Sequence, residues 1–102
     1  MSDLNKLTIK EVADGLRSKK FSSEDVMKDC LARIDERNGD LNAFVTVDSD
    51  GALEGARLAD KRLAAGEDDG VLMGVPMALK DLFNTAGVRT TCCSPGLKEF
   101  VP

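Results

Sequence analysis

The 102-residue sequence contains no histidine, which excludes the commonest catalytic arrangements. Neither a Ser-His-Asp triad nor a Cys-His pair can form within these residues. If this stretch of chain supplies a group that transfers protons, that group must be a lysine or a carboxylate.

Cysteine is scarce, and its spacing argues against a metal or disulfide site. Cys30, Cys92 and Cys93 form no C-x-x-C pair. Zinc sites are commonly built from such pairs or from histidine, and a disulfide framework normally uses an even number of cysteines. We therefore expect no metal in this chain and a reducing, cytoplasmic setting.

Long apolar runs and clusters of positive charge are also missing. No apolar run approaches the ~20 residues that a membrane-spanning helix needs, and the polar start is unlike a signal peptide. Lysine and arginine never occur more than two in a row, and the net charge is −4. Direct binding of nucleic acid by this segment is therefore not expected. The length fits one small domain.

A capping box predicts the first helix. Thr8 is followed three residues later by Glu11, which indicates a helix over about 9–18. Gly15 lies inside this helix and is expected to weaken it by about 1 kcal/mol relative to alanine. The apolar side chains recur on one face: Ile9, Val12, Ala13 and Leu16.

The second helix is predicted in the same way. Ser22 with Asp25 three residues later marks its start, and Phe21 is placed to contact Val26 across that start. Asn38-Gly39 predicts its end. Its apolar stripe contains Val26, Cys30, Leu31 and Ile34, so the two helices are expected to pack as a pair.

The remainder of the chain predicts an α/β fold. Residues 41–47 are rich in β-branched side chains and indicate a strand, and an alanine-rich helix over 52–65, capped by Asp48 or Asp50, follows. The apolar run 71–81 is interpreted as a buried strand, and 88–91 as a possible short one. Strand, helix and strand in this order predict a parallel crossover. We expect one partial domain over 1–102, with a helical pair in 1–40 packed on a mixed β-sheet in 41–102 (strands near 41–47 and 74–80).

Two polar clusters are interpreted as structural. The acidic run 67–70 is expected to be a solvated turn rather than a cation site. Cys92 and Cys93 have no neighbouring histidine or basic residue to activate a thiol, so they are expected to be packing residues. Ser94 likewise has no adjacent base.

Lys80 is the one candidate for chemistry, because it ends an otherwise apolar run. Partial burial would lower its pKa and make it a usable general base. Alternatively, its ammonium reaches solvent or pairs with Asp81 or another carboxylate. Spacing alone favours the second interpretation.

The segment Gly74-Val75-Pro76-Met77-Ala78-Leu79-Lys80-Asp81 resembles the part of the amidase-signature family that carries its catalytic lysine. Further stretches match the family in the same order: 42–47, 56–63, 89–92, Ser94 and 100–102. The resemblance covers nearly all of the chain and implies that it corresponds to the N-terminal portion of an amidase domain.

The resemblance implies a Ser-cis-Ser-Lys mechanism. Lys80 would act through a serine in a cis peptide arrangement to take the proton from a second, nucleophilic serine, which attacks an amide and releases ammonia. Both serines belong to a segment downstream of Pro102, so only Lys80 is carried over as catalytic. Asp81 would orient Lys80 or a neighbouring loop, or else merely cap the strand end.

The resemblance also implies partners. Glutamine would be hydrolysed to supply ammonia for converting Glu-tRNA(Gln) to Gln-tRNA(Gln), together with the amidotransferase B and C subunits. ATP and magnesium would be used by the B subunit, so this chain would hold no cofactor, and tRNA would be held mainly by the partner. Two alternatives stay open: a stand-alone amidase acting on a small carboxamide, and a non-catalytic truncated fragment or subunit-docking module.

Overall fold

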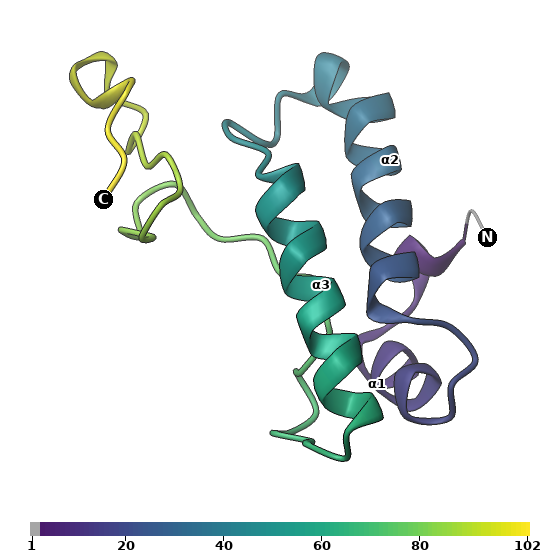
Figure 1. Cartoon of the computed structure of the whole chain (residues 1–102). Coiled ribbons are helices and arrows are strands. Elements are labelled where there is room, and N and C mark those ends of the chain that lie inside the picture. Colours follow the sequence, from purple (N-terminus) through teal and green to yellow (C-terminus); the bar gives the residue numbers. More distant parts are fainter. Residues whose placement is uncertain (1–2) are drawn as a thin grey trace.

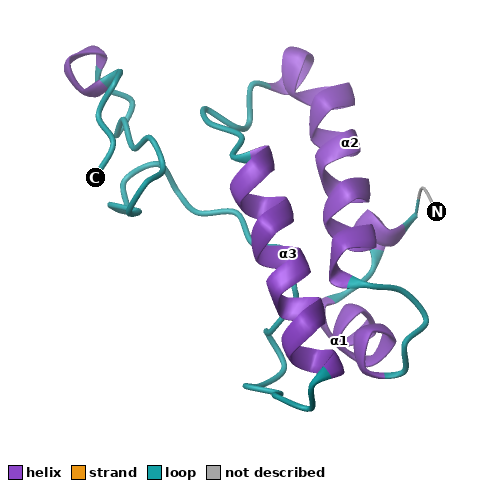
Figure 2. Ribbon diagram, viewed as in Figure 1, coloured by secondary structure: helices purple, strands orange, loops and turns teal. Residues whose placement is uncertain are grey.

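The computed structural model describes residues 3–102, which contain three α-helices and two short 3-10 helices. Their order is η1 (Leu4–Lys6), α1 (Ile9–Arg17), α2 (Ser23–Leu41), α3 (Ser49–Ala64) and η2 (Pro95–Leu97). Helices α2 and α3 lie side by side, and α1 packs near their lower ends in Figure 1. The chain then leaves this helical body as an extended connection and ends in a separate loop unit (Figures 1 and 2). None of the helices in this range is long and apolar enough to span a bilayer.

The predicted starts of α1 and α2 are confirmed, whereas α3 begins at Ser49, three residues before the predicted start at 52. The Thr8 hydroxyl accepts a hydrogen bond from the Glu11 backbone N–H (3.1 Å), and the Glu11 carboxylate accepts one from the Thr8 N–H (2.9 Å). Ser22 and Asp25 form the same reciprocal pair, with distances of 3.0 and 3.1 Å. Asp48, rather than Asp50, caps α3. Each cap satisfies N–H groups that have no partner inside the helix.

The predicted end of α2 at Asn38-Gly39 is too early, because the helix continues to Leu41. Asn42 ends it by adopting a left-handed conformation, with φ of 50°. The side-chain amide of Asn38 accepts from the Phe44 N–H (2.8 Å) and donates to the Phe44 carbonyl (3.0 Å). Asn38 thus stays helical and ties down the segment that follows the helix.

The core lies where α1 meets the start of α2. Val12 and Leu16 of α1 and Val26 of α2 are buried together with Leu4, and Phe21 packs against them. Ile9, although predicted on the same face, is 54% exposed. The amphipathic pattern of α1 and α2 therefore identifies most of the core, as the helical period requires.

The predicted mixed β-sheet does not form within residues 3–102, and the predicted α/β fold class is wrong. Residues 3–102 form helices, turns and coil without a single strand, and their only β-type pairing is an isolated bridge between Thr85 and Val88. Residues 42–48 are coil, 71–74 form turns, and 75–80 are extended without a partner. The predicted strand-helix-strand crossover is therefore replaced by a single helix flanked by loops.

Local bonding explains why these apolar runs do not pair as strands, which are stable only when their backbone groups join a ladder. The backbone of Phe44 is already bonded to the Asn38 side chain. In the second run, Gly74 has φ of +89°, outside the extended region. Its carbonyl accepts from the Ser23 hydroxyl, and Pro76 has no N–H to donate.

Gly15 lies in the middle of α1 because the ring of Phe21 packs directly on it. A methyl group at this position would overlap the ring, with Cε1 of Phe21 only 2.8 Å away. We therefore expect Gly15→Ala to destabilise the protein by about 1–3 kcal/mol through overpacking. Helix propensity alone predicts the opposite sign, a gain of about 1 kcal/mol.

Urea denaturation followed by circular dichroism measures this change. Gly55→Ala is the matched control, because Gly55 lies within α3 with nothing within 4 Å of the added methyl group, and it is expected to stabilise. Adding Phe21→Leu to Gly15→Ala should recover most of the loss. If Gly15→Ala stabilises as much as Gly55→Ala, the packing account is wrong.

Candidate functional site

Lys80 is exposed at the end of the extended segment 75–80, between the helical body and the loop unit formed by residues 81–102. Within residues 3–102 its ammonium makes neither an ion pair nor a hydrogen bond, so the alternative of pairing with Asp81 is not observed. The position of its backbone in space is fixed by hydrogen bonds to residues on either side of Lys80.

The first anchor holds Gly74, six residues before Lys80, on the start of α2. The buried Ser23 hydroxyl donates to the Gly74 carbonyl at 2.7 Å. Asp60 of α3 in turn accepts hydrogen bonds from the backbone N–H groups of Ser23 (2.7 Å) and Glu24 (3.0 Å). A carboxylate at a helix N-terminus is favourably placed for the helix dipole. The two longer helices are thereby joined at the point where the lysine segment begins.

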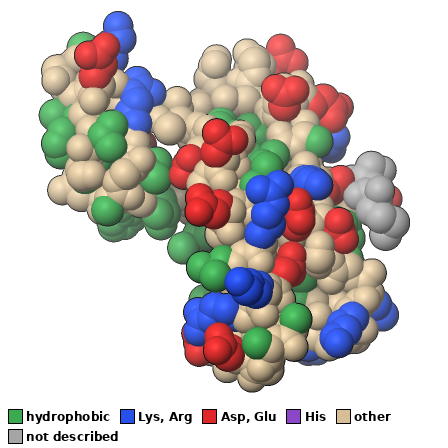
Figure 3. All heavy atoms as spheres, in the orientation of Figure 1, with side chains coloured by type: hydrophobic (Ala, Val, Ile, Leu, Met, Phe, Trp, Pro, Cys, Tyr) green, Lys and Arg blue, Asp and Glu red, His purple; other side chains and the backbone are tan. Residues whose placement is uncertain are grey.

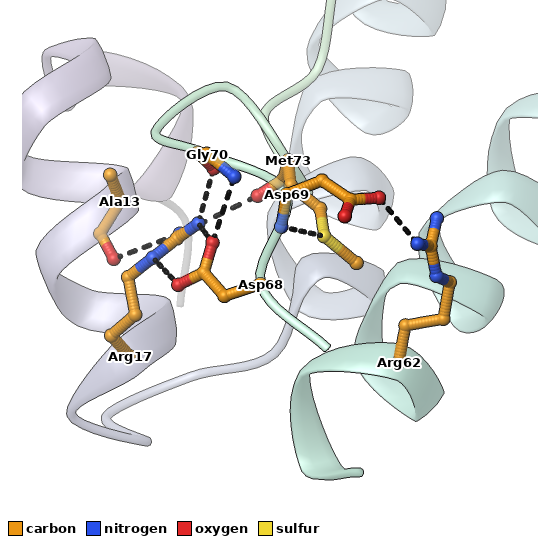
Figure 4. A network of polar contacts seen from close by, with 7 residues as sticks. All are labelled: Ala13, Arg17, Arg62, Asp68, Asp69, Gly70 and Met73. Atoms are coloured by element: carbon orange, nitrogen blue, oxygen red, sulfur yellow. Dashed lines mark hydrogen bonds and ion pairs between the residues drawn. The ribbon is translucent and has the colours of Figure 1, made fainter. Parts of the chain in front are cut away.

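The second anchor is Arg17, shown in Figure 4. Its guanidinium donates to both carboxylate oxygens of Asp68, at 2.9 and 3.0 Å. It also donates to the carbonyls of Gly70 (2.6 Å), Ala13 (3.3 Å) and Met73 (3.5 Å). A planar donor fork suits this bidentate contact, which a lysine could not reproduce. The acidic run 67–70 is thus exposed, as predicted, but it is coil rather than a turn and is tied to α1.

The ion pair between Arg17 and Asp68 predicts how stability depends on pH. The hydrogen bond from Arg17, followed by that from the Gly70 N–H, lowers the pKa of Asp68 in the folded protein. Such a carboxylate stabilises the fold above its unfolded pKa, and this contribution is lost as the pH falls through the folded pKa. We expect the free energy of unfolding to fall progressively below about pH 4. No histidine titrates nearer neutrality.

Urea denaturation between pH 2.5 and 7 tests this dependence through Asp68→Asn. The variant should be less stable than the parent protein at pH 7 and should lose less stability on acidification. Asp35→Asn is the matched control, because no ion pair of this exposed carboxylate is seen in residues 3–102, and it should leave the profile unchanged. An Asp68→Asn profile that coincides with the parent profile at every pH would contradict the assignment.

On the other side of Lys80, Asp81 joins the segment to a loop around Thr91. The Asp81 carboxylate accepts from the Thr91 backbone N–H at 2.8 Å and from the Thr91 hydroxyl. The Asp81 carbonyl accepts from the Cys92 N–H at 2.8 Å. The hydrogen bonds from Thr91 lower the pKa of the Asp81 carboxyl. The sequence analysis identified Asp81 as a candidate but did not predict that Thr91 is its partner. The only signal for Thr91 was that it lies in the stretch 89–92, which matches the amidase-signature family.

Arg89 connects the loop unit back to the helical body. It donates to the Thr46 hydroxyl (3.2 Å) and the Val45 carbonyl (3.4 Å), both in the loop between α2 and α3. It also donates to the carbonyl of Lys98 within its own unit. Residues 81–102 are therefore held on the body in two ways, through Arg89 and through the extended segment itself.

The two adjacent cysteines are not packing residues, contrary to the sequence prediction. The thiols of Cys92 and Cys93 are free and both residues are exposed. Both have left-handed backbone conformations, with φ of 50° and 56°. Cys30 is the half-buried one, and burial raises the pKa of its thiol. A thiol with a raised pKa is poorly reactive, so Cys30 is not expected to act as a nucleophile.

The neighbourhood of Lys80 is unusually apolar for an exposed surface. Hydrophobic side chains gather on the lower side of the loop unit in Figure 3. Met77 is 78% exposed, Leu79 54% and Phe83 55%. Large contiguous apolar surfaces usually mark contacts with other protein. The groups brought together here are the lysine, the Asp81–Thr91 pair and this apolar surface.

Comparison with known proteins identifies the class. The amidase family profile matches residues 25–102, and the chain belongs to the amidase family. The matched range includes the segment that carries Lys80 and the loop that carries Thr91. It does not include α1, which anchors the acidic loop through Arg17.

Among curated relatives, the chain is similar to the A subunit of glutamyl-tRNA(Gln) amidotransferase from several bacteria. It is 54% identical to the Hahella chejuensis protein over 95 residues, which covers 93% of this chain and 19% of the relative. It is 50% identical to the Azotobacter vinelandii protein over 98 residues, covering 96% of this chain and 20% of the relative. The chain thus spans about a fifth of the length of the curated relatives it matches.

Proposed function

We propose that this chain is part of a glutamine-hydrolysing amidase subunit that supplies ammonia for converting Glu-tRNA(Gln) to Gln-tRNA(Gln). The observation that carries the proposal is the identity of about half of all positions, over nearly the whole chain, to the A subunits of such amidotransferases. The reaction would take place in the cytoplasm in a complex with the B and C subunits. ATP and magnesium would be used by the B subunit, while tRNA would be held mainly by the partner.

In this proposal Lys80 is the general base. It stands on a segment fixed at Gly74 and at Asp81, so its backbone has a defined place, while its ammonium is free to meet groups from elsewhere. Two serines supplied by sequence outside these 102 residues would complete a Ser-cis-Ser-Lys arrangement. That sequence would also enclose the ammonium and exclude water from it, so that proton transfer takes place between fixed groups.

The test uses an enzyme of the relatives' length that contains these residues. Co-expressed with the B and C subunits, it should purify as a complex, release ammonia from glutamine and convert Glu-tRNA(Gln) to Gln-tRNA(Gln) when ATP is present. Hydrolysis of a small carboxamide without either partner, and without activity on glutamine, would instead identify a stand-alone amidase. Absence of any amide hydrolysis would favour a non-catalytic docking role.

The 102-residue chain alone is expected to be inactive. It contains Lys80 but no glycine- and serine-rich segment to supply the nucleophile. Rigorously purified chain should therefore release no ammonia from glutamine above the buffer background. Turnover that is proportional to the amount of purified chain would overturn the assignment of the nucleophile to other sequence.

A further inference from the structure

The loop unit of residues 81–102 has a polar centre built around Thr90 and Thr91. These are among its few buried side chains, with 3% and 4% exposure, whereas large apolar residues such as Phe83 and Val101 are more than half exposed. The Thr90 N–H donates to the Phe100 carbonyl at 3.0 Å, and its hydroxyl donates to the Val88 carbonyl at 3.1 Å. Hydrogen bonds, rather than an apolar core, therefore determine the shape of this unit.

Asp81 provides the charged part of this centre. One carboxylate oxygen accepts from the Thr91 backbone N–H at 2.8 Å, and the other accepts from the Thr91 hydroxyl. The same hydroxyl oxygen accepts from the Cys93 N–H at 3.2 Å, so its position is fixed from both sides. Hydrogen bonds to an ionised acceptor are among the stronger ones in proteins. The network thus joins the residue after Lys80 to three consecutive residues of a distant loop.

The backbone of that loop depends on these bonds. Cys92 and Cys93 both adopt left-handed backbone conformations, which are unfavourable for residues other than glycine. Their N–H groups are directed to the Asp81 carbonyl and to the Thr91 hydroxyl, respectively. Without the Thr91 hydroxyl the Cys93 N–H would lose its partner, and without the Asp81 carboxylate the hydroxyl itself would lose the acceptor that fixes it.

Lys80 is the residue whose position follows from this arrangement. Its side chain has no partner in residues 3–102, and its carbonyl accepts from the Phe83 N–H at 3.2 Å, closing a turn that contains Asp81. The direction in which Lys80 leaves the backbone is therefore set by how Asp81 is held. A displacement of about 1 Å in a catalytic group can lower a rate by about 100-fold.

We propose that Asp81 and Thr91 act as a positioning pair for Lys80, fixing the lysine-bearing turn against the loop of residues 91–93. The inference rests on the proposed function, since it assigns these residues to the reaction that Lys80 would catalyse. Neither residue needs to touch the substrate. Loss of either partner should therefore lower kcat and leave KM nearly unchanged.

The test uses the full-length enzyme assembled with its partner subunits and measures steady-state ammonia release from glutamine. Thr91→Val keeps the side-chain shape but removes the hydroxyl, and Asp81→Asn replaces one accepting oxygen with a donor. Each should lower kcat by about 10- to 100-fold with KM within about threefold. Thr91→Ser keeps the hydroxyl and should retain kcat within about threefold. The double variant Asp81→Asn/Thr91→Val should be no worse than the poorer single variant, because both break one contact.

Lys80→Ala, assayed alongside, separates this inference from the proposed function. If Lys80→Ala remains active, the assignment of the base is wrong. If Lys80→Ala is inactive while Asp81→Asn and Thr91→Val keep the parent kcat, the positioning pair is wrong and the base assignment stands. Equal losses in Thr91→Ser and Thr91→Val would also overturn the pair, since the hydroxyl would then be irrelevant. Should Asp81→Asn fail to fold, the comparison of the two Thr91 variants decides alone.

Discussion

Leu16→Ala should destabilise this protein more than any other single truncation of an apolar side chain in α1. Leu16 is 6% exposed and lies in the core cluster with Val12 and Val26. Removing a buried leucine side chain costs about 2–5 kcal/mol, because transfer free energy is lost and a cavity remains. A domain of this size has a total stability of about 5–15 kcal/mol. The variant should therefore lose a large part of the stability of the protein.

The effect should also reach the lysine segment. Cδ1 of Leu16 lies against Gly74, only 2.8 Å from the position a Cβ would occupy there. Gly74 is the residue that the Ser23 hydroxyl holds on α2. Loss of the leucine side chain therefore removes packing from the first anchor of the segment that carries Lys80.

Urea denaturation followed by circular dichroism measures the change in unfolding free energy. Leu58→Ala is the matched control, since it makes the same change at a helix position that is 57% exposed, and it should shift stability by less than about 0.5 kcal/mol. Equal losses in the two variants would contradict the assignment of the core to the contact between α1 and α2.

The helical part of the fold could be predicted from the sequence because its signals are local. The capping boxes at Thr8 and Ser22 place helix starts within one residue, and the 3.6-residue period identifies Val12, Leu16 and Val26 as core residues. The end of α2 was harder to place. Asn38 followed by glycine is typical of a helix end, but the Asn38 side chain instead forms hydrogen bonds with the backbone of Phe44, beyond the helix.

The strands were predicted wrongly because an apolar, β-branched run does not specify a partner. Residues 41–47 and 74–80 have strand composition, yet within the described part of the chain nothing pairs with them. Short apolar runs are the weakest secondary-structure signals for this reason. Backbone contacts from the side chains of Asn38 and Ser23 fix the path of these segments instead.

The anchors of the candidate site were invisible to sequence reasoning because they join distant residues. Arg17 and Asp68 are hydrogen-bonded although they are 51 residues apart in the sequence, and Ser23 and Asp60 are 37 residues apart. Periodicity and capping rules describe neighbours within about four residues and carry no information on such pairs. The place of Lys80 at the end of an apolar run made it a candidate, and the resemblance to the amidase-signature family then gave Lys80 and Asp81 their expected roles, which stay predictions.

Lys80→Arg should nearly abolish amide hydrolysis in the full-length enzyme, although it keeps the charge and approximate length of the side chain. A general base must lose its proton near neutral pH, which an enclosed lysine can do and an arginine cannot. Loss of general-base catalysis lowers rates by about 10²–10⁴-fold. Lys80 makes no ion pair within residues 3–102, so the substitution breaks no structural contact there. If Lys80 were merely a surface charge, the arginine variant would work as well as the parent enzyme.

Steady-state ammonia release from glutamine by the assembled enzyme tests this claim most directly. Lys80→Ala and Lys80→Arg are compared with Lys61→Arg, which makes the same conservative change at an exposed position of α3, and circular dichroism confirms that each variant is folded. We expect both Lys80 variants to fall by about 10²–10⁴-fold in kcat while Lys61→Arg matches the parent enzyme. A folded Lys80→Arg enzyme that keeps more than about a tenth of the parent kcat would contradict the assignment of Lys80 as the base.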